Sequence, residues 1–168
     1  MTAQVLTYHM PAGVPGNVTR SQTSRIEPNN FDKNYPCLAY GIPVKIVSGL
    51  IRTLPSGAVA GDIYGMLVRP FPINSSFGAP AALGAGTPNV GGPCDILAAG
   101  YMTVTLARGT AVRGAAVGVR TTAGSHTLLD IEDTANVGAG DSDCVLLGAT
   151  FMGPADANGL VEIYFKTR

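Results

Sequence analysis

The side chains best suited to metal binding or catalysis are widely separated in this sequence. The two histidines, His9 and His126, are 117 residues apart. A metal site or a histidine-based triad needs further partners of the right type, and no residue pairs with either histidine by motif or spacing. We therefore predict no metal site, no cofactor and no catalytic histidine.

Acidic residues gather in one region of the chain, at Asp130, Glu132, Asp133, Asp141 and Asp143. Two such carboxylates could serve a hydrolase if their surroundings separated their pKa values. Calcium could also use them, but the alternating ligands, central glycine and terminal glutamate of an EF-hand loop are missing. We predict that this region is a solvated loop.

Glycines at positions 84, 86, 91 and 92 do not follow a phosphate-binding pattern. They match neither GxxxxGK[ST] nor a GxGxxG that opens a helix, and these are the spacings that cradle phosphates. The GxSxG and HExxH motifs of hydrolases and metalloproteases are also missing from the sequence. The motifs therefore predict that the chain is not an enzyme.

The three cysteines, Cys37, Cys94 and Cys144, are widely spaced and odd in number. This argues against a disulfide framework and against a CxxC zinc site. A free cysteine packs as a small hydrophobic residue. We predict that all three are buried in the core.

Charge and composition indicate a part of an assembly. The formal net charge is zero and the eleven Lys and Arg residues are scattered, so we predict no nucleic-acid partner. No apolar run approaches the ~18 residues of a membrane span, so we predict no membrane partner. Charged residues make up 13% of the chain, against about 25% in a typical soluble domain. Such a surface is best explained if other protein covers much of it.

The elements that would position these residues are short strands. The chain holds 22 glycines and 12 prolines, and they interrupt its apolar runs about every ten residues, as in a sandwich or barrel. We predict an all-β fold with an antiparallel β-sandwich or jelly-roll-like body over residues 41–168. The expected strands span residues 43–47, 50–54, 63–69, 94–97, 100–106, 115–120, 144–147 and 160–165.

Residues 1–40 show no sustained period and are predicted to form an extended N-terminal arm. Such arms lie on a partner, because alone they cannot bury enough surface to offset their ordering entropy. The alternative is that the segment is one more strand of the body. Aromatic, methionine and arginine side chains are enriched at interfaces, and the predicted contacts are Tyr8, Met10, Arg20, Arg25, Phe31 and Tyr35.

Five segments carry a family resemblance: GIPVKIVSG at 41–49, YGMLVRPFP at 64–72, GYMTV at 100–104, RGTAVRGAAVGVR at 108–120 and GATFMGPAD at 148–156. With these segments the chain resembles the structural cement, or head decoration, proteins of tailed bacteriophages. The resemblance implies a β-sandwich or jelly-roll-like body that docks on the outside of the capsid, and it carries no catalytic motif.

The function implied by this resemblance is that of a non-enzymatic capsid cement protein on the outer surface of the virion. Its partners would be the major capsid protein and further copies of the chain, with a dimer favoured slightly over a trimer. It would bind and stabilise the expanded head by mass action.

Two other functions remain open. One is a carbohydrate- or host-surface-binding β-sandwich module displayed on a virion, which needs an exposed aromatic platform, although aromatics are 7% of the chain and Trp is absent. The other is a cupin-like β-barrel enzyme, which needs clustered histidine and carboxylate ligands.

Overall fold

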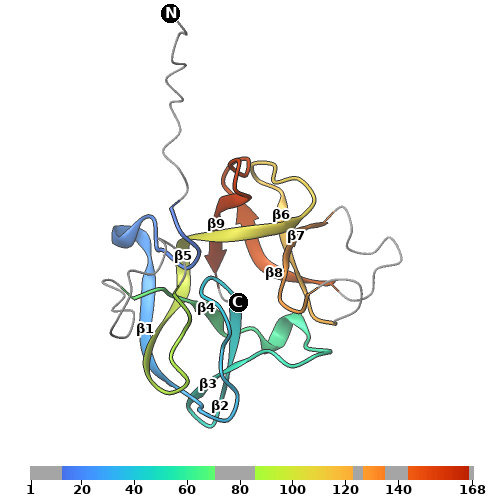
Figure 1. Ribbon diagram of the computed structural model, residues 1–168. Coiled ribbons are helices and arrows are strands. Elements are labelled where there is room, and N and C mark those ends of the chain that lie inside the picture. Colours follow the sequence, from blue (N-terminus) through green and yellow to red (C-terminus); the bar gives the residue numbers. More distant parts are fainter. Residues whose placement is uncertain (1–12, 71–85, 123–126, 135–143, 167–168) are drawn as a thin grey trace, which may run out of the picture.

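The computed structural model describes residues 13–70, 86–122, 127–134 and 144–166, and strands dominate this part of the chain (Figure 1). The strands are β1 (Arg25–Phe31), β2 (Pro43–Val47), β3 (Leu50–Thr53), β4 (Gly65–Leu67), β5 (Gly92–Arg108), β6 (Ala116–Arg120), β7 (Ile131–Asp133), β8 (Cys144–Phe151) and β9 (Leu160–Lys166). The described helical elements are two short 3-10 turns, η1 (Ser21–Thr23) and η2 (Ala60–Asp62). No helix among the described residues has the length and apolar character needed to cross a membrane.

The nine strands pair as two rings that share β5. The first ring runs β1-β3-β2-β4-β5 and is closed by the pairing of β1 with β5. The second runs β5-β7-β6-β8-β9 and is closed by the pairing of β5 with β9. In each ring one pairing is parallel, β1 with β3 and β5 with β7, and the others are antiparallel. The predicted all-β class is confirmed, whereas the sandwich or jelly-roll detail is not.

The shared strand β5 is longer than the sequence predicts. It is one strand of 17 residues, where two strands were predicted on either side of Ala98-Ala99. Gly100 lies within it with φ +137°, and an added Cβ there would come within 2.2 Å of the Ser24 side chain. The glycine therefore marks a close approach of another segment, and the strand continues past it.

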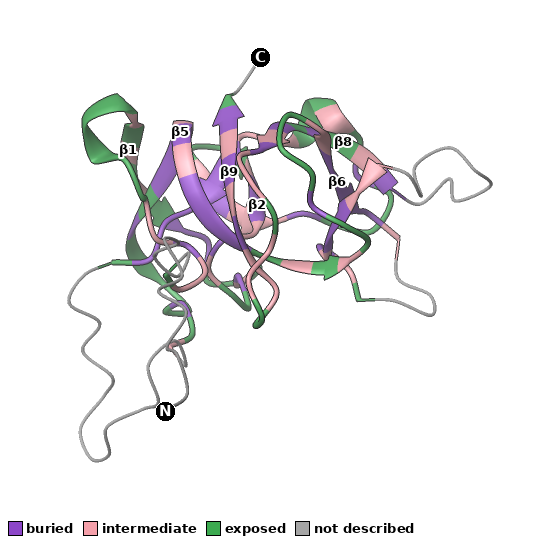
Figure 2. Cartoon of the chain, turned by 90° about the horizontal axis from the view of Figure 1, so that it is seen from above, coloured by how far each residue is buried: buried purple, intermediate pink, exposed green. Residues whose placement is uncertain are grey.

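A hydrophobic core lies in each ring, and Met66 of β4, a first-ring strand, packs in the core of the second. The first core includes Val44, Ile51 and Ile96, and the second includes Met102 and Phe151. Since β5 contributes to both cores, the two rings are packed around one common strand. Figure 2 shows buried residues along β5 and along the neighbouring β9.

All three cysteines lie within the described residues, and all are buried without a disulfide. Burial raises the pKa of the Cys37 thiol to about 11 and that of Cys94 to about 12, because a low-polarity environment disfavours the thiolate. The prediction that the cysteines are small buried residues is confirmed.

Strand β1 lies inside the segment that was predicted to be an extended arm. Its residues pair with β5 from Arg25 opposite Ala99 to Phe31 opposite Gly92. Residues 25–31 are therefore part of the body, as the alternative interpretation held. Residues 1–12 lie outside the described residues.

Candidate functional site

The prediction that the acidic region is a solvated loop is wrong for Glu132. Glu132 lies on β7 and is fully buried with Arg120 of β6. The Arg120 Nε is 2.7 Å from one carboxylate oxygen of Glu132, and Nη2 is 3.1 Å from the other. Strands β6 and β7 are paired neighbours in the second ring, so the two side chains lie close enough to form this ion pair. This carboxylate thus has a structural ion-pair partner. Asp141 and Asp143 lie outside the described residues.

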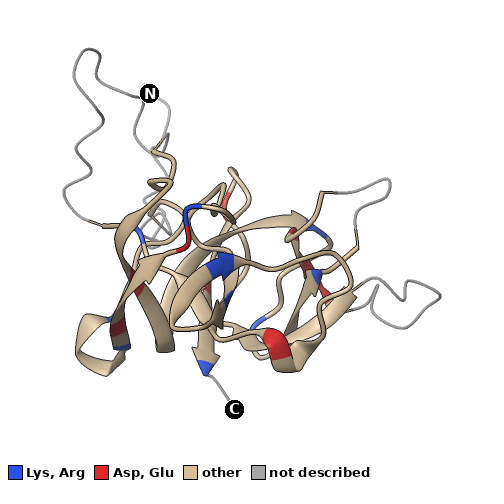
Figure 3. Cartoon of the chain, turned by 90° about the horizontal axis from the view of Figure 1, so that it is seen from below, with Lys and Arg blue, Asp and Glu red and all other residues tan. Residues whose placement is uncertain are grey.

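The described residues contain no group of three or more His, Cys, Asp or Glu side chains that could hold a metal ion. His9 and His126, the candidate histidines, lie outside the described residues. Figure 3 shows the charged residues scattered over the described strands and loops.

Residues 13–24 lie along β5 and form a segment that we call the N-terminal anchor. The Gly16 amide donates to the Thr103 carbonyl at 2.8 Å. The Thr103 amide in turn donates to the Asn17 carbonyl at 2.9 Å, and the Thr19 amide donates to the Tyr101 carbonyl at 3.1 Å. Because β9 pairs with this same part of β5, the anchor occupies the opposite edge of the strand.

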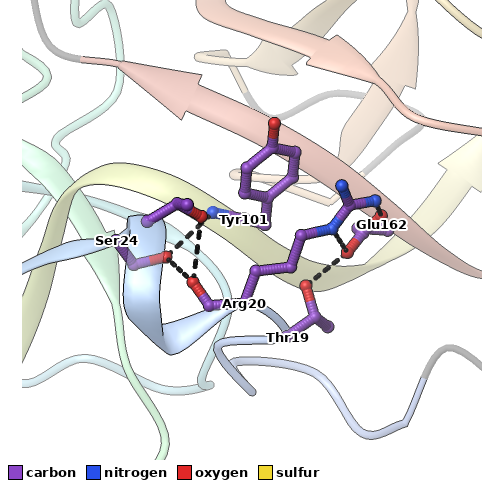
Figure 4. Close-up of polar contacts among 6 residues, drawn as sticks. Thr19, Arg20, Ser24, Tyr101 and Glu162 are labelled. Carbon is purple, nitrogen blue, oxygen red and sulfur yellow. Dashed lines mark hydrogen bonds and ion pairs between the residues drawn. The ribbon is translucent and has the colours of Figure 1, made fainter.

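A cluster of side chains fastens the anchor to β9 (Figure 4). The guanidinium of Arg20 is bidentate to the carboxylate of Glu162, with Nη2 to Oε2 at 2.7 Å and Nε to Oε1 at 3.2 Å. The Thr19 hydroxyl donates to the same carboxylate. The Arg20 guanidinium also lies 4.2 Å from the ring centroid of Tyr101, which packs against Tyr164. The hydrogen bond to Glu162 raises the pKa of Arg20, so the guanidinium keeps its charge at every ordinary pH.

Two loops at the Gly92 end of β5 run side by side. In the loop of residues 32–41, the Tyr40 hydroxyl is 3.5 Å from the carbonyl of Thr87 in the loop of residues 86–91. An added Cβ at Gly91 would lie 3.8 Å from the Lys33 side chain. The first loop meets the second at both of these points, so the two form one surface.

The comparisons with known proteins bear on what such surfaces serve. A family model described as structural cement protein (E217 gp24/Pam3 gp6), of phages, matches residues 1–166. The chain belongs to this family. It is thus a structural protein of the phage virion, located on the capsid.

A solved structure of similar fold comes from the capsid of Myoviridae phage XM1. The two chains superpose with a TM-score of 0.64 at 15% identity, and the alignment covers 99% of this chain and 98% of the other. At this identity the likeness concerns the fold. No curated protein matches the sequence.

The structure places the predicted contact residues of this chain in different environments, some exposed and one buried. Arg20 is half exposed and held by Glu162. Arg25 is exposed, with its Nε 3.3 Å from Glu27. Phe31 is 8% exposed and packs in the first core, so its expected place on the surface is wrong: β1 turns this ring inward.

Tyr8 and Met10 lie outside the described residues, and Tyr35 is 51% exposed. Two further exposed apolar residues of the two adjoining loops, Leu38 and Val90, were not predicted as contacts. Single apolar residues in irregular loops carry no periodic signal, so only the folded surface distinguishes them from core residues.

Proposed function

We propose that this chain is a non-enzymatic cement protein that binds the outside of the major capsid protein lattice and stabilises the expanded head. The family match over residues 1–166 carries this proposal. A protein that binds only the expanded lattice stabilises that lattice by mass action. It needs surface area and many copies for this task, and no reactive groups.

The composition supports the same function. With 46% hydrophobic and 13% charged residues, the chain covers its own surface poorly, and large apolar patches usually mark interfaces. A carbohydrate-binding module would need a free aromatic platform, and the tyrosine pair of Tyr101 and Tyr164 is partly covered by Arg20.

We further propose that the N-terminal residues bind the capsid shell. The anchor holds residues 13–24 on β5, which gives the preceding residues a fixed starting point. Fixing one end of a segment lowers the entropy that the segment loses on binding. Tyr8 and Met10 supply apolar contact area, and Arg25 and Tyr35 are exposed on the body.

The test compares expanded and unexpanded shells assembled from the major capsid protein, each mixed with the full-length chain. We expect saturable binding to expanded shells and a higher disruption temperature for the decorated ones. Tyr8→Ala/Met10→Ala should lower occupancy, whereas His9→Ala, between them, serves as the control. Wild-type protein that fails to bind expanded shells would overturn the proposed function. Full occupancy by the double variant would overturn the role of the N-terminal residues alone.

A further inference from the structure

Three large side chains project from the paired loops at the Gly92 end of β5. Tyr35, Leu38 and Val90 are 51%, 79% and 61% exposed. We call these three residues the loop strip. Exposed apolar residues scattered singly need no explanation, but three on two adjoining loops form a candidate interface.

Tyr35 of the loop strip is held in place by a series of contacts. The buried Asp32 carboxylate accepts from the Asn34 amide at 2.9 Å and lies 2.7 Å from Nη2 of Arg52. The Arg52 guanidinium in turn lies 4.4 Å from the ring centroid of Tyr35. A preformed surface loses less entropy on binding than a mobile one, so these contacts favour association.

The loop strip continues from the N-terminal anchor. Pro15 of the anchor and Leu38 of the strip line one groove of about 270 Å³, with Tyr40 between the two loops and the anchor. Gly16 packs so closely on Tyr40 that an added Cβ would approach the Tyr40 Cβ to 2.6 Å. Leu38 and the start of the anchor therefore line the same groove.

Charge argues against a second copy of this chain as the occupant. Lys33 is exposed beside the strip, while the carboxylate of Asp32 is buried and paired with Arg52. Within the two loops, residues 32–41 and 86–91, no exposed carboxylate accompanies Lys33. A twofold contact of the strip with itself would bring two lysines together, which is unfavourable.

We propose that the loop strip docks on a subunit of the major capsid protein, through an apolar surface of that subunit with a carboxylate opposite Lys33. This inference rests on the proposed function. It adds a preformed contact surface on the body to the contact made by the N-terminal residues.

The experiment measures binding of full-length variants to expanded shells of the major capsid protein. Leu38→Asp and Val90→Asp each place a charge in the strip, and we expect each to weaken shell binding by about tenfold or more, as for a buried interface residue. Lys33→Glu should also weaken binding, by repulsion. The matched controls are Val112→Asp and Val59→Asp, whose valines are 58% and 60% exposed elsewhere on the body, and they should bind like the wild type. Circular dichroism and thermal unfolding confirm that each variant is folded.

Each outcome decides the inference. Wild-type binding by both Leu38→Asp and Val90→Asp would overturn the loop strip, while the proposed function would stand on the binding of the unaltered chain. Equal losses in the control variants would also overturn it. If the strip variants keep shell binding but sediment as smaller species, the strip is a contact between copies. Tighter binding of Lys33→Glu would overturn the carboxylate on the partner. Wild-type protein that does not bind shells would remove the proposed function together with this inference.

Discussion

The buried ion pair of Arg120 and Glu132 is the clearest case in which a single residue depends on its partner. Both side chains are removed from water, and the two hydrogen bonds of one bidentate contact satisfy the carboxylate. Burying charges costs free energy, and the attraction between them offsets that cost only while the pair is intact. Loss of Glu132 removes the carboxylate that Arg120 and, at 3.9 Å, Arg108 both contact.

Glu132→Gln should therefore lower the free energy of unfolding by about 3–5 kcal/mol, as for other broken buried pairs. Glu27→Gln is the control, because Glu27 is partly exposed beside Arg25 and an exposed pair contributes less than about 1 kcal/mol. Denaturant unfolding followed by circular dichroism measures both. Equal stability of Glu132→Gln and wild type would contradict the burial of a charged pair.

The buried thiols predict a dependence of stability on pH. The pKa values of Cys37 and Cys94 are raised to about 11 and about 12 from the usual thiol value of 9.0. The unfolded chain therefore loses these protons at a lower pH than the folded chain does. Their contribution to stability is complete below pH 9 and should be lost progressively as pH rises from there through about 11 for Cys37 and about 12 for Cys94.

The measurement is thermal unfolding from pH 8 to 11, with Cys37→Ala/Cys94→Ala as the reference. The wild type should lose more stability over this range than the double variant does. Parallel curves would show that the two thiols ionise equally in the folded and unfolded chains.

At the scale of elements, the N-terminal anchor behaves as an additional strand segment on β5. Its amides bond to the edge of β5, and Arg20 fastens it to β9 through Glu162. Glycine is required at position 16, because this residue has φ +87° and an added Cβ would collide with Tyr40. Close backbone packing thus complements the ion pair.

Breaking the Arg20–Glu162 contact should loosen the anchor while leaving the body folded. In Arg20→Gln, we expect faster hydrogen exchange at the Thr19 and Thr103 amides and a loss of at most about 1 kcal/mol in global stability, since the arginine is half exposed. The exchanged pair Arg20→Glu/Glu162→Arg should restore part of the protection. Unchanged exchange in Arg20→Gln would mean that the backbone contacts alone hold the anchor.

At the scale of the whole molecule, β5 couples the two rings. Both cores contain residues of β5. The same strand therefore completes both rings and packs in the core of each. A surface with few charges surrounds these cores, and we predict that the chain also associates with itself.

Sedimentation of the purified chain tests this prediction. We expect a closed homo-oligomer at micromolar concentration, with a dimer favoured over a trimer, because twofold contacts are the commonest closed arrangement. A monomer at all concentrations, unchanged by added shells, would contradict self-association.

The sequence by itself determined the elements whose signals are local. Turn residues and β-branched runs predicted β2 at its observed bounds and β6, β8 and β9 to within a few residues at their ends. The Ser48-Gly49 turn between β2 and β3 follows the same rule, with φ values of 52° and 76° that suit a two-residue hairpin. These features depend on residues adjacent in the chain.

The tertiary structure alone decided the features that depend on distant partners. Strand β1 contains Pro28 and two asparagines, which disfavour a strand, yet its pairing with β5 stabilises it. The same pairing turns Phe31 into a core residue, and the pairing of β6 with β7 buries Glu132 with Arg120. Local sequence cannot report such contacts, because their free energy comes from segments brought together only by the closed rings.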